Sequence, residues 1–257
     1  MPYTDDMQIN ELDSFVTAFP VHPGEEAAAK RRFMTLFAQG EEQILVGGTS
    51  YVRKVRSFTG ETFALKRLLT TGITAKDVQL SGEDSARITK GHAAAFYEEY
   101  KSQLLVSHMR GFPKLYGYGQ IGGDPAIVME WIEGVSLREL ERRRREEGLP
   151  VGGEIVAEIG VAVLEALYSI ERLDSTLAHR DISSANIMIR TDAVSLEDQI
   201  ASGEFDVCLI DFGSASARTA DDPSFTMVSQ VWRNGTPAYA PPEMLTQDLP
   251  HIDELRK

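Results

Sequence analysis

HRDISSAN, residues 179–186, followed twenty-five positions later by DFG at residues 211–213, is the stretch from which the fold can be predicted. It holds two carboxylates and one amide, Asp181, Asn186 and Asp211, each in a short polar run. Carboxylate and amide oxygens are the ligands that Mg²⁺ accepts, and a carboxylate can also take the proton of a hydroxyl group. The pattern therefore predicts a loop-borne site for a metal-bound nucleotide and a hydroxyl nucleophile.

The order and spacing of the two runs resemble the catalytic loop and the metal loop of eukaryotic-like protein kinases, in a bacterial-type variant. The resemblance implies that Asp181 orients the attacking hydroxyl and accepts its proton, while Asn186 and Asp211 hold Mg²⁺. It also implies that Arg180 clamps an ordered or phosphorylated activation segment. The sequence departs from the family at Ser183, where Ser/Thr kinases usually have a lysine.

A third stretch, GTPAYAPPE at residues 235–243, resembles the end of the activation segment of Ser/Thr kinases, with Pro241 where alanine is usual. By that resemblance Thr236 would contact Asp181, which fits a Ser/Thr acceptor. Small-molecule kinases of the aminoglycoside type share the other two loops but lack this stretch. The resemblance, over residues 43–257, thus implies transfer of the ATP γ-phosphate to a protein substrate.

A lysine on an expected strand needs an anionic partner. Alternation along residues 62–68 points Ala64 and Lys66 to the same face, and a buried unpaired ammonium group is costly. The resemblance implies that Lys66 contacts the α- and β-phosphates of ATP and pairs with a glutamate on the following helix. Glu98 and Glu99 are the candidates, and we favour Glu99 because Phe96, three residues earlier, lies where the family places an aromatic residue.

Two further stretches resemble the parts of a kinase that hold the nucleotide. LVGGTSYV at residues 45–52 takes the place of the phosphate-covering hairpin, although only Gly47 matches a family glycine. MEWIEG at residues 129–134 resembles the segment that contacts adenine through a backbone carbonyl and a backbone N–H, here those of Glu130 and Ile132. The implied nucleotide contacts are Leu45, Gly47, Gly48, Ser50, Val52, Ala64, Lys66, Met129, Glu130, Ile132 and Met188.

The expected architecture is α+β and bilobal, with a small lobe built on an antiparallel sheet and a mainly helical large lobe that is incomplete. We expect an N-terminal extension with one helix at 1–42, the small lobe at 43–131, and a partial large lobe at 132–257. Periodicity predicts strands at 44–46, 51–57, 62–68, 113–120, 125–131, 187–189 and 205–210, and helices at 25–39, 93–109, 136–147 and 154–173. The polar stretch 70–91 is expected to be a loop or a short lid, and the polar excursion 190–203 a loop.

Composition narrows the class of protein. The formal net charge of −13 disfavours nucleic acid as a partner. Residues 1–6 carry no apolar run and no stretch approaches 18 apolar residues, so we expect neither a signal peptide nor a membrane span. The single cysteine, Cys208, fits a reducing compartment, and we expect a cytoplasmic protein.

Two hypotheses for function follow. The chain stops fourteen residues after Glu243, so we expect a fragment of a longer kinase, equipped for catalysis but poorly active on its own. The alternative is a nucleotide-binding pseudokinase or scaffold that transfers no phosphate, which the serine at position 183 favours. The sequence leaves the substrate, the activating signal and the oligomeric state open.

Overall fold

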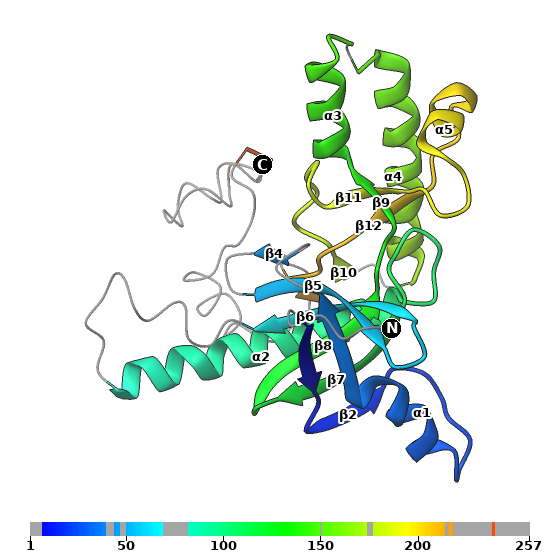
Figure 1. The fold of residues 1–257 in the computed structure, drawn as a ribbon. Coiled ribbons are helices and arrows are strands. Elements are labelled where there is room, and N and C mark those ends of the chain that lie inside the picture. Colours follow the sequence, from blue (N-terminus) through cyan, green and yellow to red (C-terminus); the bar gives the residue numbers. More distant parts are fainter. Residues whose placement is uncertain are drawn as a thin grey trace. The chain divides into compact units, whose positions relative to one another are not determined.

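The computed structural model of the chain describes residues 7–39, 44–46, 50–68, 82–149, 151–173, 177–213, 216–217 and 238–239. The chain divides into two compact units (Figure 1). Unit 1 comprises Met1–Ser107 and Pro113–Trp131, and unit 2 comprises His108–Phe112 and Ile132–Lys257. No helix within the described ranges is long and apolar enough to cross a membrane.

Unit 1 is built on one curled, eight-stranded antiparallel sheet. Its strands are β1 (Met7–Glu11), β2 (Ser14–Thr17), β3 (Thr35–Gln39), β4 (Ile44–Val46), β5 (Ser50–Ser57), β6 (Thr62–Leu68), β7 (Leu115–Ile121) and β8 (Asp124–Glu130). They follow the order β1-β3-β5-β6-β8-β7-β2, and β4 also pairs with β5. The helices of this unit are α1 (Glu26–Met34) and α2 (Gly82–Val106).

The segment before β3 lies on both edges of this sheet. β1 pairs with β3 and β2 pairs with β7, yet only Leu12 and Asp13 separate β1 from β2. A chain that passes from one edge to the other within two residues requires the sheet to curl toward closure. β2 can approach β7 closely because Gly117 has no side chain: a Cβ there would lie 2.3 Å from the Val16 carbonyl oxygen.

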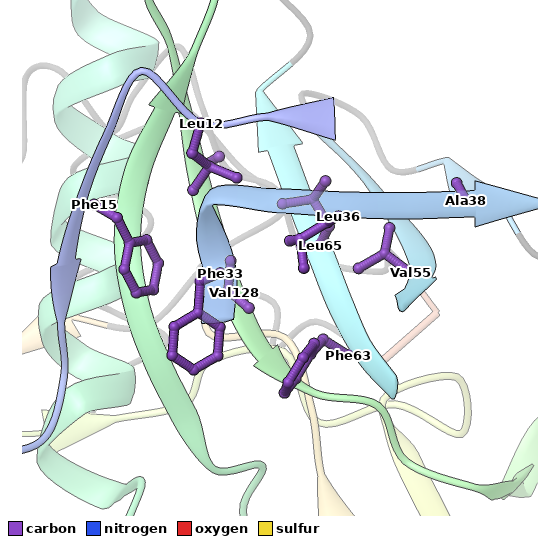
Figure 2. Close-up of a cluster of buried hydrophobic side chains, with 10 residues drawn as sticks. Leu12, Phe15, Phe33, Leu36, Ala38, Val55, Phe63, Leu65 and Val128 are labelled. Carbon is purple, nitrogen blue, oxygen red and sulfur yellow. The ribbon is translucent and has the colours of Figure 1, made fainter. Parts of the chain in front are cut away.

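The inside of the curl is filled by a hydrophobic cluster. Alternate residues of β3, β6 and β8 point into it together with Val55 of β5, and Leu12, Phe15 and Phe33 of the N-terminal segment close it (Figure 2). Its members are Leu12, Phe15, Phe33, Leu36, Ala38, Val55, Phe63, Leu65, Ala126 and Val128. The N-terminal segment is therefore part of the core of unit 1.

Three expectations for unit 1 are corrected by these strands and helices. Residues 7–17, expected as an extension, form β1 and β2. The helix expected at 25–39 ends at Met34, because Leu36 and Ala38 alternate into the core on a strand that pairs with β1 and β5. The loop expected at 70–91 is helical from Gly82 onward; helix propensity is a weak local preference that the rest of α2 overrides.

The described residues of unit 2 form two small sheets and three helices. Its strands are β9 (Gly134–Ser136), β10 (Leu177–Ala178), β11 (Ile187–Arg190), β12 (Val207–Leu209) and β13 (Ser216–Ala217), and its helices are α3 (Leu137–Glu146), α4 (Gly153–Leu173) and α5 (Leu196–Ser202). The sheets have the orders β12-β11-β9 and β10-β13. α4 buries one stripe of residues at helical spacing, which are Ile159, Val163, Ala166 and Ile170.

The excursion at 190–203, expected as a loop, contains the short helix α5. Ser195 caps it by accepting a hydrogen bond from the Asp198 N–H at 3.2 Å. Gln199 is buried, and its side chain donates to the carbonyls of Arg190 and Val194 at 2.6 and 2.9 Å. These bonds tie the excursion to the end of β11.

Candidate functional site

The sheet register places the expected nucleotide-contacting side chains of unit 1 on one face. Val52, Lys66 and Ile127 are paired across β5, β6 and β8, and so are Lys54, Ala64 and Met129. Directly paired residues of antiparallel strands project to the same side of the sheet. This is the face opposite the hydrophobic cluster, since Val55, Leu65 and Val128 alternate with these residues.

Lys66 and Glu99 form an ion pair in the centre of unit 1. The distance from Lys66 Nζ to Glu99 Oε1 is 2.5 Å, and the two residues are only 4% and 5% exposed. Glu98 lies on the outer side of α2 and pairs with Lys101 at 2.6 Å. The structure thus selects Glu99, as expected from Phe96, which is buried against Leu68, Tyr100, Leu115 and Ile127.

One contact of this face was not predicted. Gln103, one helical turn after Glu99, is buried and donates from Nε2 to Met129 Sδ at 3.3 Å. The i, i+4 spacing of Glu99 and Gln103 was visible in the sequence and could have suggested that both face the sheet. α2 therefore contacts both Lys66 and Met129, which lie on neighbouring strands.

The last residue of β8 and the two residues after it carry the expected adenine contacts. Glu130 is bound to Lys114 through its backbone and through its side chain. Its N–H donates to the Lys114 carbonyl at 2.8 Å, and its carboxylate accepts from the Lys114 N–H at 2.9 Å. Lys54 Nζ lies 5.2 Å from the ring centroid of Trp131, a cation–π contact that was not predicted. Ile132 is buried and begins unit 2.

In unit 2 the side-chain amide of Asn186 bridges the two ends of the loop at residues 181–186. Asn186 Nδ2 donates to Asp181 Oδ2 at 2.8 Å and to the Asp181 carbonyl at 3.0 Å. The Asn186 N–H donates to the Ser183 carbonyl at 2.9 Å. Because the NH₂ group of Asn186 faces Asp181, its Oδ1, the atom that can ligate a metal, points to the other side.

Asp211 is linked to the same loop through the backbone. The N–H of Ile210 donates to the Asn186 carbonyl at 2.9 Å, and Asp211 itself has a φ of 66°, in the left-handed region. Its Oδ1 accepts from the Gly213 N–H at 3.1 Å. A residue whose backbone is held in this rarely populated conformation is typical of a ligand-binding position.

The donor set fits Mg²⁺. One amide oxygen and one carboxylate suit an ion that keeps several waters and takes further oxygens from phosphate groups. In the ranges that the structure describes, no group of three His, Cys, Asp or Glu side chains could hold a metal ion without such added ligands. Asn186 and Asp211 are thus suited to a metal that arrives with a nucleotide.

His179 supports both loops from within the core. Its ring is buried, Nε2 lies 3.2 Å from the Ile210 carbonyl oxygen, and the ring centroid lies 4.7 Å from that of Phe212. Burial lowers the pKa of His179 below its ordinary value, although the nearby Asp211 and Asp181 carboxylates and the Ile210 carbonyl act in the opposite direction. A neutral imidazole therefore packs between the two loops.

Other expected site residues are placed as follows. Arg180 is exposed and has a φ of 63°, also in the left-handed region. Met188 is half-buried and pairs with Ser136 and Cys208. Leu45 is exposed on β4 beside Val52, and Ser50 begins β5. Gly47, Gly48 and Thr236 lie outside the described residues.

Comparison with known proteins identifies the family. The family model of the protein kinase domain matches residues 39–254. The Ser/Thr-protein kinase PknL of Mycobacterium bovis is 34% identical over 223 residues, which are 87% of this chain and 46% of PknL. A probable Ser/Thr-protein kinase of Streptomyces coelicolor, SCO3848, is 34% identical over 58% of this chain and 20% of its own length. The Arabidopsis thaliana calmodulin-binding receptor-like cytoplasmic kinase 2 is 26% identical over 85% of this chain and 45% of its own length.

A solved structure agrees at the level of the fold. The apo form of PpkA-294 matches with a TM-score of 0.52 and 19% identity, over 79% of this chain and 62% of that chain. The chain spans less than half the length of these three curated relatives. The expected α+β kinase fold is confirmed, and the chain belongs to the protein kinase family.

Proposed function

We propose that this chain carries the ATP-binding and catalytic parts of a protein serine/threonine kinase. The observation that carries the proposal is the hydrogen-bonded link from Asp181 through Asn186 to Ile210, which brings a candidate base and two candidate metal ligands into one connected structure. The small lobe would comprise residues 43–131 and the partial large lobe residues 132–257. The substrate would be a protein Ser or Thr hydroxyl.

Asp181 would orient that hydroxyl and accept its proton. Its carboxylate is held at Oδ2 by Asn186, so the amide fixes the direction in which the carboxylate presents itself. Asn186 Oδ1 and Asp211 would hold Mg²⁺, and Mg²⁺ bound to ATP would neutralise charge on the phosphates during transfer. Positioning of this kind supplies most of the catalysis of phosphoryl transfer.

Lys66 would place its ammonium group on the α- and β-phosphates. Glu99 gives the buried ammonium group of Lys66, in the middle of β6, an anionic partner, because a buried ammonium without one would be costly. The nucleotide would lie against Leu45, Gly47, Gly48, Ser50, Val52, Ala64, Met129, Glu130, Ile132 and Met188. Arg180 and Thr236 would order the segment that receives the substrate, and the single cysteine supports a cytoplasmic setting.

Transfer of radiolabelled phosphate from ATP to casein tests this function. From this chain we expect weak but measurable Mg²⁺-dependent labelling of Ser and Thr, and a fall of about a hundredfold or more in Asp181→Asn, the usual size of a general-base contribution. Calorimetry should show ATP binding that weakens without Mg²⁺ and in Asp211→Asn. Equal ATP affinity with and without Mg²⁺ would refute the metal assignment.

Ser183 favours one alternative, a pseudokinase that binds nucleotide without transferring phosphate. Its hydroxyl is buried and has no hydrogen-bond partner among the described residues, and a serine supplies no positive charge where a lysine is usual. Mg²⁺-dependent ATP binding without Asp181-dependent labelling of casein would support this alternative. Labelling that Asp181→Asn abolishes would exclude it.

A further inference from the structure

Ser184 is a buried hydroxyl in the middle of the catalytic loop. It lies three residues after Asp181 and is 6% exposed. Its carbonyl accepts from the Arg138 N–H at the start of α3, at 2.8 Å. The preceding residue, Ser183, is held by the hydrogen bond from the Asn186 N–H, so the loop that carries Asp181 sets the position of the Ser184 side chain.

Tyr239 reaches this hydroxyl from a distant part of the chain. Its Oη lies 2.9 Å from Ser184 Oγ, across 55 residues of sequence. The residue is 51% exposed, so burial of the ring does little to fix it. The hydrogen bond to Ser184 ties Tyr239 to the loop that carries Asp181.

The two residues belong to stretches with different tasks in the proposed reaction. Ser184 shares its loop with the candidate base, and Tyr239 lies in the 235–243 stretch, which by resemblance lies beside the protein acceptor. Both groups are neutral hydroxyls, and one donates while the other accepts. Such a contact adds no charge near the phosphates, and its effect is one of position alone.

We infer that the Ser184–Tyr239 hydrogen bond is a positioning contact that holds Tyr239 in register with Asp181. It sets where a protein Ser or Thr hydroxyl meets the base, and it leaves nucleotide binding to Lys66, Asn186 and Asp211. This inference rests on the proposed kinase function. It goes beyond that function by assigning acceptor placement to two residues that were not among the expected site residues.

Three variants test the contact in the full chain, with casein as acceptor. Tyr239→Phe removes only the hydroxyl and keeps the ring, Ser184→Ala removes the other partner, and Ser184→Thr retains a hydroxyl. We expect Tyr239→Phe and Ser184→Ala each to lower kcat/KM for casein about fivefold, the size of one neutral hydrogen bond. Ser184→Thr should recover most of the loss, and the KM for ATP should stay unchanged in all three.

The double variant and a matched control separate positioning from a general structural effect. Tyr239→Phe combined with Ser184→Ala should lose no more than either single variant, because both remove the same bond. Tyr168→Phe, at a tyrosine of α4 that is 60% exposed, should leave kcat/KM for casein unchanged. Hydrogen exchange at positions 238 and 239 should be faster in Tyr239→Phe than in the wild type.

The outcomes distinguish the two proposals. Single-variant losses that add in the double variant, or a change in the KM for ATP equal to that for casein, would overturn the positioning role. An active wild type with unaffected variants would also overturn it while leaving the kinase function intact. A wild type without Asp181-dependent transfer would overturn both.

Discussion

Unit 1 and unit 2 hold their polar site residues by different means. In unit 1, Lys66 and Glu99 lie within regular elements, a central strand and a packed helix, and they are buried as an ion pair. In unit 2, Asp181 and Asp211 lie in loops that depend on side-chain and backbone hydrogen bonds. The unit 2 site also contains two non-glycine residues with positive φ, whereas unit 1 has none among its described residues.

The site residues of the two units should therefore affect stability differently: those of unit 1 support the core, and those of unit 2 carry backbone strain. A charge buried inside regular structure contributes to function and to the integrity of the core together, so its loss should damage both. A strained loop costs folding free energy in exchange for a fixed side-chain direction. The four predictions below test this contrast, beginning with the largest expected effect.

Lys66→Met should lower the free energy of unfolding by about 3–5 kcal/mol, because it leaves the Glu99 carboxylate buried without its cation. Adding Glu99→Leu should recover most of that loss, since an apolar pair of similar size carries no desolvation cost. Asp181→Asn, a nearly isosteric change in a half-buried loop, should cost about 1 kcal/mol or less. Denaturant unfolding followed by circular dichroism measures all three, and equal losses in Lys66→Met and Asp181→Asn would break the comparison.

Gly117→Ala should cost about 1–3 kcal/mol, because the added methyl group would meet the backbone of β2 and the ring of Phe15. The matched control is Gly160→Ala in α4, where a Cβ would have open space around it. That change should raise stability by about 0.5–1 kcal/mol through helix propensity. Thermal unfolding of both variants would show whether closure of the unit 1 sheet depends on this close approach, and a neutral Gly117→Ala would show that it does not.

Arg180→Gly and Arg180→Ala both remove the side chain, so their difference reports on the backbone. At a φ of 63°, glycine should be more stable than alanine by about 1 kcal/mol. Arg110, an exposed residue of unit 2 without a positive φ, provides the control, and there alanine should be the more stable by about 0.4–1 kcal/mol. If the same residue, glycine or alanine, were the more stable at both positions, backbone strain at position 180 would be contradicted.

The pH dependence of stability is the smallest effect. Burial holds the pKa of His179 below its ordinary value, so the folded protein keeps this imidazole neutral while the unfolded chain takes up a proton. Stability should therefore fall as the pH drops through the ordinary histidine range, by at most about 0.7 kcal/mol between pH 7 and pH 6 for this one group. His179→Gln should flatten the thermal-unfolding profile over that interval, and an unchanged slope would contradict the assignment.

The N-terminal region shows where sequence patterns did not suffice. Leu36 and Phe37 continue the apolar spacing of α1, and only their pairing with β1 and β5 makes them part of a strand. Helical and extended patterns are ambiguous over such short apolar runs. The strands of residues 7–17 were missed for a similar reason, because their pairing partners, β3 and β7, lie elsewhere in the sequence.

The sequence by itself determined the family, the α+β class and the lysine of the central ion pair, because fixed spacing and strand alternation are properties of the local chain. It narrowed the partner of Lys66 to two adjacent glutamates, and helix packing decided for Glu99. Only the tertiary structure revealed the curl of the unit 1 sheet, the Gln103–Met129 contact and the Ser184–Tyr239 bond. These depend on contacts between residues far apart in sequence, which no local pattern encodes.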